Sequence, residues 1–177
     1  MDPYAENYDA SAIEDNGSCK YPFQGPKNPS FEDSYGGLAA PHWYCTTRNG
    51  NNIISNKSYV YREEDKNATE GQYCCKLELK YSTDAYQIFQ EDVNLGHTKE
   101  ILFDYTETLN AGGKGIIELS FVTGSSTTII GSITVDVQSR KDVKFTLPTM
   151  PKENGKFILE YRTHDSNYDG TLLVDNI

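Results

Sequence analysis

Short segments in which apolar and polar residues alternate, each followed by a turn, constrain the fold of this chain more than any other feature. In the segment 73–79, the side chains of Tyr73, Cys75, Leu77 and Leu79 fall on one face. The segments 100–109, 116–122, 143–147 and 156–163 alternate in the same way. A period of two residues is that of a half-buried β-strand, and no long stretch has the period of a helix. Many short strands joined by turns predict an all-β fold, and we expect an antiparallel β-sandwich.

The first and last predicted strands each carry one carboxylate. They are Asn28-Pro29-Ser30-Phe31-Glu32 and Leu173-Val174-Asp175-Asn176-Ile177. We expect these two strands to lie side by side, which would bring Glu32 and Asp175 together. The chain ends within the second of them and begins without a secretion signal, so we expect it to be a piece of a longer protein.

The chain is expected to contain two parts. Residues 1–22 are acidic, follow no helical or strand period and close on the turn sequence before Cys19. The stretch from Pro22 to Pro29 contains three prolines and Gly25, which is typical of a boundary. The sequence therefore predicts a linker or repeat over residues 1–22 and one domain over residues 28–177.

Charge and motif patterns exclude several functions. With 26 acidic and 16 basic residues, the net charge is −10, which disfavours nucleic acid and suits cation binding and an extracellular location. No run approaches the roughly 18 apolar residues of a membrane span. No nucleophile motif or phosphate-binding glycine loop occurs, and the acidic pair Glu63-Glu64 falls in a charged turn. We therefore expect a binding domain and not an enzyme.

The four cysteines lack the spacing of a metal site, and they favour disulfides in an extracellular protein. Cys45 pairing with Cys74 or Cys75 is the expected bridge. A vicinal bridge and free thiols remain alternatives, because four cysteines allow three connectivities.

Two parts of the chain resemble known families. The pattern Asp-Pro-x-Ala-x-Asn-Tyr-Asp, closing on Asp-Asn-Gly-Ser-Cys at Cys19, resembles an acidic repeat of secreted Bacteroidetes surface proteins, related to thrombospondin type 3 calcium repeats. The usual first cysteine of that repeat is absent, which leaves the partner of Cys19 open. The resemblance implies a calcium-stabilised linker involving Asp9 and Asp15, and a plain acidic linker is the alternative.

The main domain resembles the jelly-roll carbohydrate-binding modules of families 4, 9 and 22, in the galactose-binding-like superfamily. The resemblance is carried by the order of several motifs: Asn28-x-Ser30-Phe31-Glu32, Trp43, Gly71-x-Tyr73-x-x-x-Leu77, Gln90-x-x-Val93-x-Leu95-Gly96 and Leu172-Leu173-Val174-Asp175-Asn176-Ile177. Pro29 departs from the family's usual glycine. The resemblance implies a jelly roll with a structural Ca²⁺ held by Glu32 and Asp175, together with backbone oxygens near Asn28 and at Lys76.

A concave sheet that binds sugar needs planar polar side chains and aromatic faces. The predicted strand faces opposite the core carry such a mixture, and the candidates are Tyr86, Gln90, Asp104, Glu118, Arg162 and His164. Trp43 is expected in the core. The alternative binding surface is an edge site built from loop tyrosines, namely Tyr35, Tyr44, Tyr59, Tyr61 and Tyr168.

We therefore predict a non-catalytic carbohydrate-binding module of a secreted or cell-surface multidomain protein, with a polysaccharide or glycan and other domains of the same chain as partners. The alternative is a structural or adhesion domain of a long surface, filament or virion protein that does not bind sugar.

Overall fold

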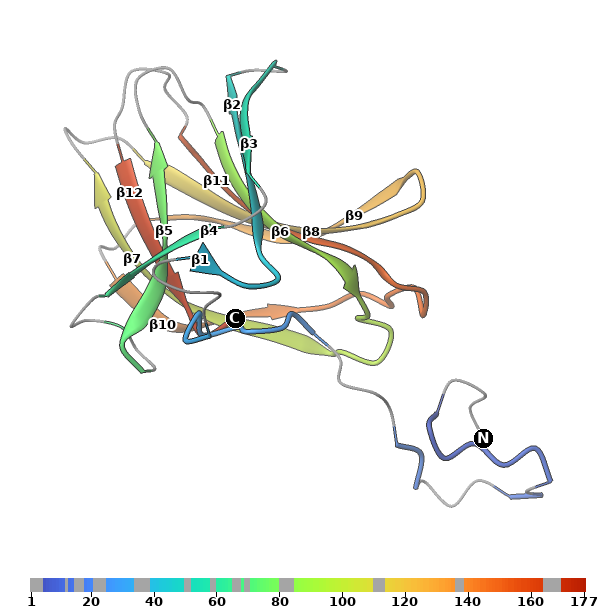
Figure 1. Ribbon diagram of the computed structural model, residues 1–177. Coiled ribbons are helices and arrows are strands. Elements are labelled where there is room, and N and C mark those ends of the chain that lie inside the picture. The colour runs from blue at the N-terminus through green and yellow to red at the C-terminus, as the bar shows by residue number, and fades with distance from the viewer. Residues whose placement is uncertain are drawn as a thin grey trace.

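The computed structural model describes residues 5–11, 13–14, 18–20, 25–33, 39–49, 52–57, 60–64, 68, 71–79, 85–109, 114–135, 139–163 and 170–177. These residues form no helix, so none of them belongs to a helix that could span a membrane. Their strands form two six-stranded sheets in which every pair is antiparallel (Figure 1). The prediction of an antiparallel β-sandwich is confirmed.

We name each sheet after its central strand. In order across the β12 sheet, the strands are β1 (Ala39–Ala40), β4 (Val60–Glu64), β5 (Tyr73–Leu79), β12 (Gly170–Asp175), β7 (Glu100–Leu109) and β10 (Ser139–Thr146). In order across the β11 sheet, they are β3 (Asn52–Lys57), β2 (Tyr44–Asn49), β6 (Ala85–Val93), β11 (Gly155–Thr163), β8 (Gly115–Thr123) and β9 (Ser126–Thr134). Neighbouring strands are mostly far apart in sequence, so long-range pairing holds the fold together.

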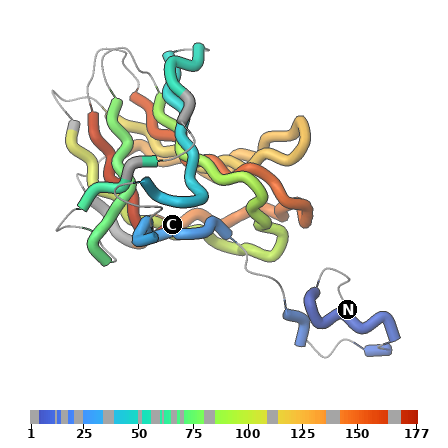
Figure 2. Tube along the Cα trace, viewed as in Figure 1, coloured from blue at the N-terminus to red at the C-terminus, as the bar shows by residue number. Residues whose placement is uncertain are grey.

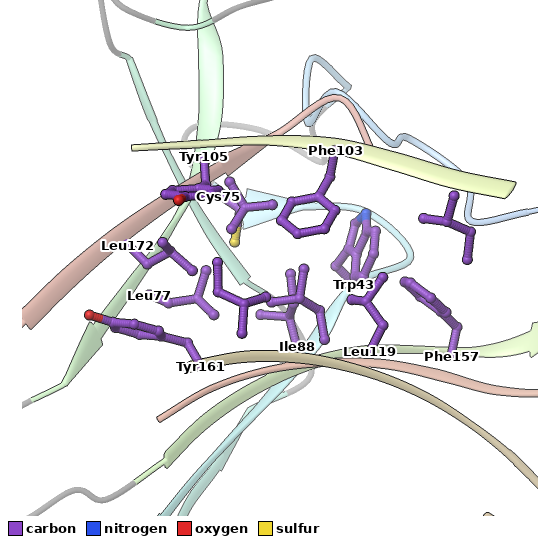
Figure 3. Packing of buried hydrophobic residues seen from close by; sticks show 14 of the residues in the cluster. Trp43, Cys75, Leu77, Ile88, Phe103, Tyr105, Leu119, Phe157, Tyr161 and Leu172 are labelled. Atoms are coloured by element: carbon purple, nitrogen blue, oxygen red, sulfur yellow. The ribbon is translucent and has the colours of Figure 1, made fainter. Parts of the chain in front are cut away.

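The core lies between the two sheets, and Trp43 is its largest fully buried side chain. Figure 3 shows the Trp43 ring between the sheets, in the layer that also contains Phe103 from β7 and Leu119 and Phe157 from the β11 sheet. The ring centroid lies 5.3 Å from that of Phe31 and 6.3 Å from that of Phe157. The prediction that Trp43 is a core residue is confirmed.

The opening segment is not the strand that the sequence predicts. Asn28 and Phe31 have φ angles of 50° and 60°, in the left-handed region that β-strands do not use. Pro29 also lacks the N–H that a ladder needs. The opening segment nevertheless lies beside the last residues of the chain: the Ile177 N–H donates to the Pro29 carbonyl at 3.1 Å, and Figure 2 shows the C-terminus beside this segment.

The N-terminal segment closes on itself. The Glu6 N–H donates to the Lys20 carbonyl at 2.7 Å, and the Asn7 side chain bonds both to Lys20 and to the Ser18 carbonyl. The side-chain and backbone hydrogen bonds from Ser11 lower the pKa of Asp9. Asp15 lies outside the described residues, so the calcium-binding repeat stays a prediction.

No disulfide forms among the four cysteines, all of which lie in the described ranges, contrary to the disulfide prediction. Cys45 and Cys75 are both buried in the core, but they come from different sheets, and the Cys45 sulfur contacts the Tyr86 hydroxyl at 3.5 Å. Cys74 is on the opposite face of β5 from Cys75, because successive side chains of a strand alternate, and its thiol contacts the Glu63 carbonyl oxygen at 3.7 Å.

A buried polar pair links the two sheets. The Tyr161 hydroxyl on β11 donates to Glu107 Oε1 on β7 at 2.7 Å, and both residues are buried. Gly115 makes room for the pair, because a Cβ there would lie 2.0 Å from Glu107 Oε1. Burial raises the pKa of Glu107, and the hydrogen bond from Tyr161 opposes that rise.

The raised pKa of Glu107 predicts a pH dependence of stability. The folded state binds the proton more tightly than the unfolded state, so this contribution to stability is complete below the ordinary carboxyl pKa of 4.5 and is lost as the pH rises through the raised value. We expect Glu107→Gln, which keeps an acceptor for Tyr161, to be more stable than the wild type at neutral pH and to lose this pH dependence. Urea unfolding across the acidic range measures both effects, and a variant curve that parallels the wild-type curve would contradict the assignment.

Candidate functional site

A row of polar side chains crosses the outer face of the β11 sheet. Strand register aligns Gln87 on β6 with Glu160 on β11, and Glu160 with Glu118 on β8. Phe157, Leu159 and Tyr161 of β11 are buried in the core, so the side chains of Glu160 and Arg162 lie on the opposite face. The same alternation places Glu118 outward between Ile117 and Leu119.

Arg162 joins these side chains into one network. Its Nη2 atom lies 3.1 Å from Glu118 Oε2, and its Nη1 atom lies 3.7 Å from Glu160 Oε1. Gln87 Nε2 donates to the other oxygen of Glu160 at 2.5 Å. Two carboxylates directly opposite each other on neighbouring strands repel, and the shared guanidinium offsets that repulsion. The network thus connects four planar polar side chains on the outer face of the β11 sheet.

An aromatic pair borders the network. Tyr44 on β2 and Phe89 on β6 are paired in register, and their rings stack with centroids 5.4 Å apart and an interplanar angle of 19°. The Lys156 ammonium lies 3.5 Å from the centroid of the Phe89 ring and forms an ion pair with Glu91. Phe89 is therefore covered, whereas Tyr44 is 37% exposed and presents the ring that a ligand can reach.

Of the five described side chains among the six predicted to bind sugar, the structure brings two together. Glu118 and Arg162 are ion-paired on the outer face of the β11 sheet. His164 lies outside the described residues. The other three, Tyr86, Gln90 and Asp104, lie elsewhere in the fold.

Tyr86 and Gln90 point toward the interior and not toward solvent. Both are buried, and the Gln90 amide bonds to the backbone N–H and carbonyl of Lys27. The strand 85–93 carries apolar residues in both phases, so the sequence pattern does not reveal which phase is inward. The inward phase is the one that contains Ile88.

Asp104 belongs to the other sheet. It lies on β7, on the side opposite the buried Phe103 and Tyr105, and is itself only 4% exposed. Its carboxylate accepts the Asp142 N–H at 2.5 Å, at the point where the β7–β10 register shifts. Asp104 therefore supports a β-bulge and is not part of the Arg162 network.

Sequence reasoning missed Gln87 and Glu160. Glu160 precedes Arg162 by two residues and shares its face, a signal that was available in the alternation of β11. The signal for Gln87 was not available, because only the register between β6 and β11 places it beside Glu160.

Most of the tyrosines proposed for the alternative edge site are not placed by the structure. Tyr35, Tyr59 and Tyr168 lie outside the described residues, the side chain of Tyr61 on β4 is not described, and Tyr44 belongs to the stacked pair on the sheet. A pocket of about 500 Å³ opens at one end of the sandwich, and it is lined by residues 96–100 and 146–150, which do not include Tyr44. The alternative edge site therefore stays a prediction.

The predicted metal donor Glu32 ties the opening segment to β5. Its Oε1 atom accepts the N–H groups of Gln72 at 2.9 Å and Tyr73 at 2.8 Å. Gly71 has a φ angle of 67°, and a Cβ on it would lie 2.2 Å from the Glu32 carboxyl carbon, so this approach requires glycine.

Arg62 places a positive charge next to Glu32. Its Nη1 atom donates to the carbonyl oxygens of Glu32 and Phe31, and its guanidinium lies 3.7 Å from the centroid of the Tyr73 ring. The side chain is buried. A cation is thus already in contact with part of the predicted metal-binding segment.

The predicted donor set fits calcium only in part. The Asn28 carbonyl accepts from the Phe31 N–H at 3.2 Å and from Trp43 Nε1 at 3.0 Å, which uses both lone pairs, so Asn28 does not fit. Glu32 Oε2, the Asp175 carboxylate and the Lys76 carbonyl are oxygens of the kind that Ca²⁺ prefers. Within the described ranges, no group of three or more His, Cys, Asp or Glu side chains is placed to hold a metal.

Comparison with known proteins supports the fold. No protein-family model and no curated protein matches the chain. The chain is similar to a family 28 carbohydrate-binding module specific for non-crystalline cellulose, with a TM-score of 0.58 and 17% identity over 86% of this chain and 93% of the other. It is also similar to a family 61 module solved in complex with beta-1,4-galactotriose, with a TM-score of 0.51 and 18% identity over 85% and 92% of the two chains.

These similarities define the class of fold. The chain has the jelly-roll β-sandwich fold of carbohydrate-binding modules, as the sequence resemblance predicts. The likeness to the thrombospondin-type repeat stays a prediction.

Proposed function

We propose that this chain is a non-catalytic carbohydrate-binding module that binds a polysaccharide on the outer face of the β11 sheet. The observation that carries the proposal is the network of Gln87, Glu160, Arg162 and Glu118 beside the exposed ring of Tyr44. Fixed planar donors and acceptors suit the hydroxyl groups of a sugar, and an aromatic ring suits its apolar face. Of the modules with a similar fold, the family 28 module is specific for non-crystalline cellulose and the family 61 module was solved in complex with beta-1,4-galactotriose.

The same geometry argues against glycoside hydrolysis. Glycosidases place two carboxyl groups on either side of the bond that breaks. Here Glu118 and Glu160 lie side by side on the same face of one sheet and share one guanidinium. Neither is placed as an acid across a cleft from the other, which supports a binding role.

A glycan panel tests the proposal. We expect the intact chain to be retarded in affinity electrophoresis by at least one soluble polysaccharide. In ¹⁵N spectra, oligosaccharides of that polymer should shift the amide signals of β6, β8 and β11 and leave those of β5 and β12 unchanged. Shifts confined to the residues that line the end pocket would move the site there, and an absence of binding across plant, algal and host glycans would reject the function.

The setting of the domain is part of the proposal. A glycan-binding domain with an acidic linker fits a secreted or cell-surface protein in which other domains of the same chain act on or hold the glycan. The net charge of −10 is consistent with an extracellular location. Expression of the longer protein with detection at the cell surface would test this assignment.

We also propose that Glu32 and Asp175 hold a structural calcium ion. In its support, the first and last segments of the domain meet at Pro29 and Ile177. At a free calcium concentration 100 times the Kd, the folded state should gain about 2.7 kcal/mol. We expect EGTA to lower the Tm, calcium to restore it, and Glu32→Gln to abolish the difference. If calcium does not shift the Tm of the wild type, the calcium proposal is wrong, and the charge next to Glu32 is that of Arg62.

A structural or adhesive role is the second candidate, and one edge of the β11 sheet favours it. Strand β9 has nine residues without charge or proline, its Ile129 is 61% exposed, and no described strand pairs with its outer side. Two other edge strands have features that block pairing: β1 has only two residues, and the pairing of β10 is irregular between Arg140 and Val143. Concentration-dependent association in sedimentation, lost in Ile129→Lys, would support this candidate.

A further inference from the structure

The outer face of the β11 sheet carries several cations beside its carboxylates. Its described side chains include the cations Arg48, Lys156 and Arg162 and the carboxylates Glu91, Glu118 and Glu160. These cations lie on one face of a chain whose net charge is −10. Their ion pairs decide which positive charge remains for a ligand.

The pairing leaves Arg48 as the cation available to a ligand. Lys156 pairs with Glu91, and Arg162 is shared between Glu118 and Glu160. Among the residues that the structure describes, no carboxylate lies within ion-pair distance of Arg48, and its buried Nε atom has no hydrogen-bond partner. A half-buried guanidinium without a counter-ion is poorly compensated, because charged groups removed from water need a partner.

Register places Arg48 at the end of the proposed binding site. Arg48 is paired with Ala85, and Ala85 is paired with Arg162, so the two arginines flank a small side chain on the same face. Their backbones are two strand spacings apart, about 10 Å, close to the width of a sugar ring with its substituents. Arg48 is on β2, the strand that also carries the exposed ring of Tyr44.

We propose that Arg48 binds an anionic substituent of the glycan, a carboxylate or a sulfate ester, so that the polysaccharide is acidic. This inference rests on the proposed function of the face. The planar guanidinium donates two parallel N–H groups to such an oxyanion. The network around Arg162, in which two carboxylates share one guanidinium, then binds hydroxyl groups, while Arg48 binds the charged ring.

Two matched polymer pairs test the inference: polymannuronate with its carboxyl-reduced form, and a sulfated galactan with its desulfated form. We expect the charged member of one pair to bind about tenfold more tightly than its neutral counterpart, with a preference that weakens as salt is added. The pair that shows the preference identifies the substituent. Equal or weaker binding of the charged members, with binding of neutral glycans intact, overturns this inference alone.

Variants locate the preference on Arg48. Arg48→Gln should reduce the preference for the charged polymer to near unity, and Arg48→Lys should keep part of it because the charge remains without the fork. Lys144→Gln is the matched control: it makes the same charge change on the β12 sheet, where Lys144 pairs with Glu100. A preference that survives in Arg48→Gln, or that falls equally in Lys144→Gln, overturns the assignment. If no charged or neutral polymer binds, the proposed function fails together with this inference.

Discussion

Arg162→Ala should weaken glycan binding by about 30-fold or more, the loss of about 2 kcal/mol or more that marks a central residue of a binding surface. Arg162 is the one side chain in the network that contacts both carboxylates. Without it, Glu118 and Glu160 face each other across neighbouring strands as like charges and separate. The variant therefore removes one hydrogen-bonding side chain and displaces two others.

Isothermal titration with the polysaccharide identified in the panel measures this effect. Arg162→Lys should retain part of the affinity, because a lysine keeps the charge but cannot hold two carboxylates with a planar fork. Lys144→Gln is the control for a lost positive charge at a distant position. The Tm of each variant shows whether it is folded, and a folded Arg162→Ala variant with wild-type affinity would place the binding site elsewhere.

Trp43→Ala should lower the free energy of unfolding by about 3–5 kcal/mol, the usual cost of deleting a large buried aromatic side chain. The ring is fully buried and packs against Phe31 and Phe157. The substitution also removes the Nε1–H donor to the Asn28 carbonyl. Both the core and the anchoring of the opening segment are weakened.

Urea unfolding of three variants separates these contributions. Trp43→Phe keeps an aromatic ring but loses the hydrogen bond. Its free energy of unfolding should therefore lie between those of the wild type and Trp43→Ala. Tyr44→Ala, at the neighbouring exposed position, should cost about 1 kcal/mol or less. If Trp43→Ala lowers the free energy of unfolding by no more than Tyr44→Ala does, the Trp43 ring is not central to the core.

The sequence by itself determined the class of fold. The alternation in 73–79 and 156–163 depends only on the strand period and on the need to bury one face, so it is readable without any tertiary contact. Trp43 was also expected in the core, as the structure shows. The inward face of the strand 85–93 could not be predicted in this way, because both of its faces carry apolar side chains. Tyr86 and Gln90 were therefore assigned to the wrong side.

Only the tertiary structure decided which residues form the candidate site. Gln87, Glu118 and Arg162 lie on three different strands and meet because β11 pairs with β6 on one side and with β8 on the other. Arg48 joins them through the register of β2 with β6. Register between strands distant in sequence is set by the packing of the whole sandwich, whereas alternation along one strand is a local property, so the sequence determined the faces of most strands and the structure decided which residues lie side by side.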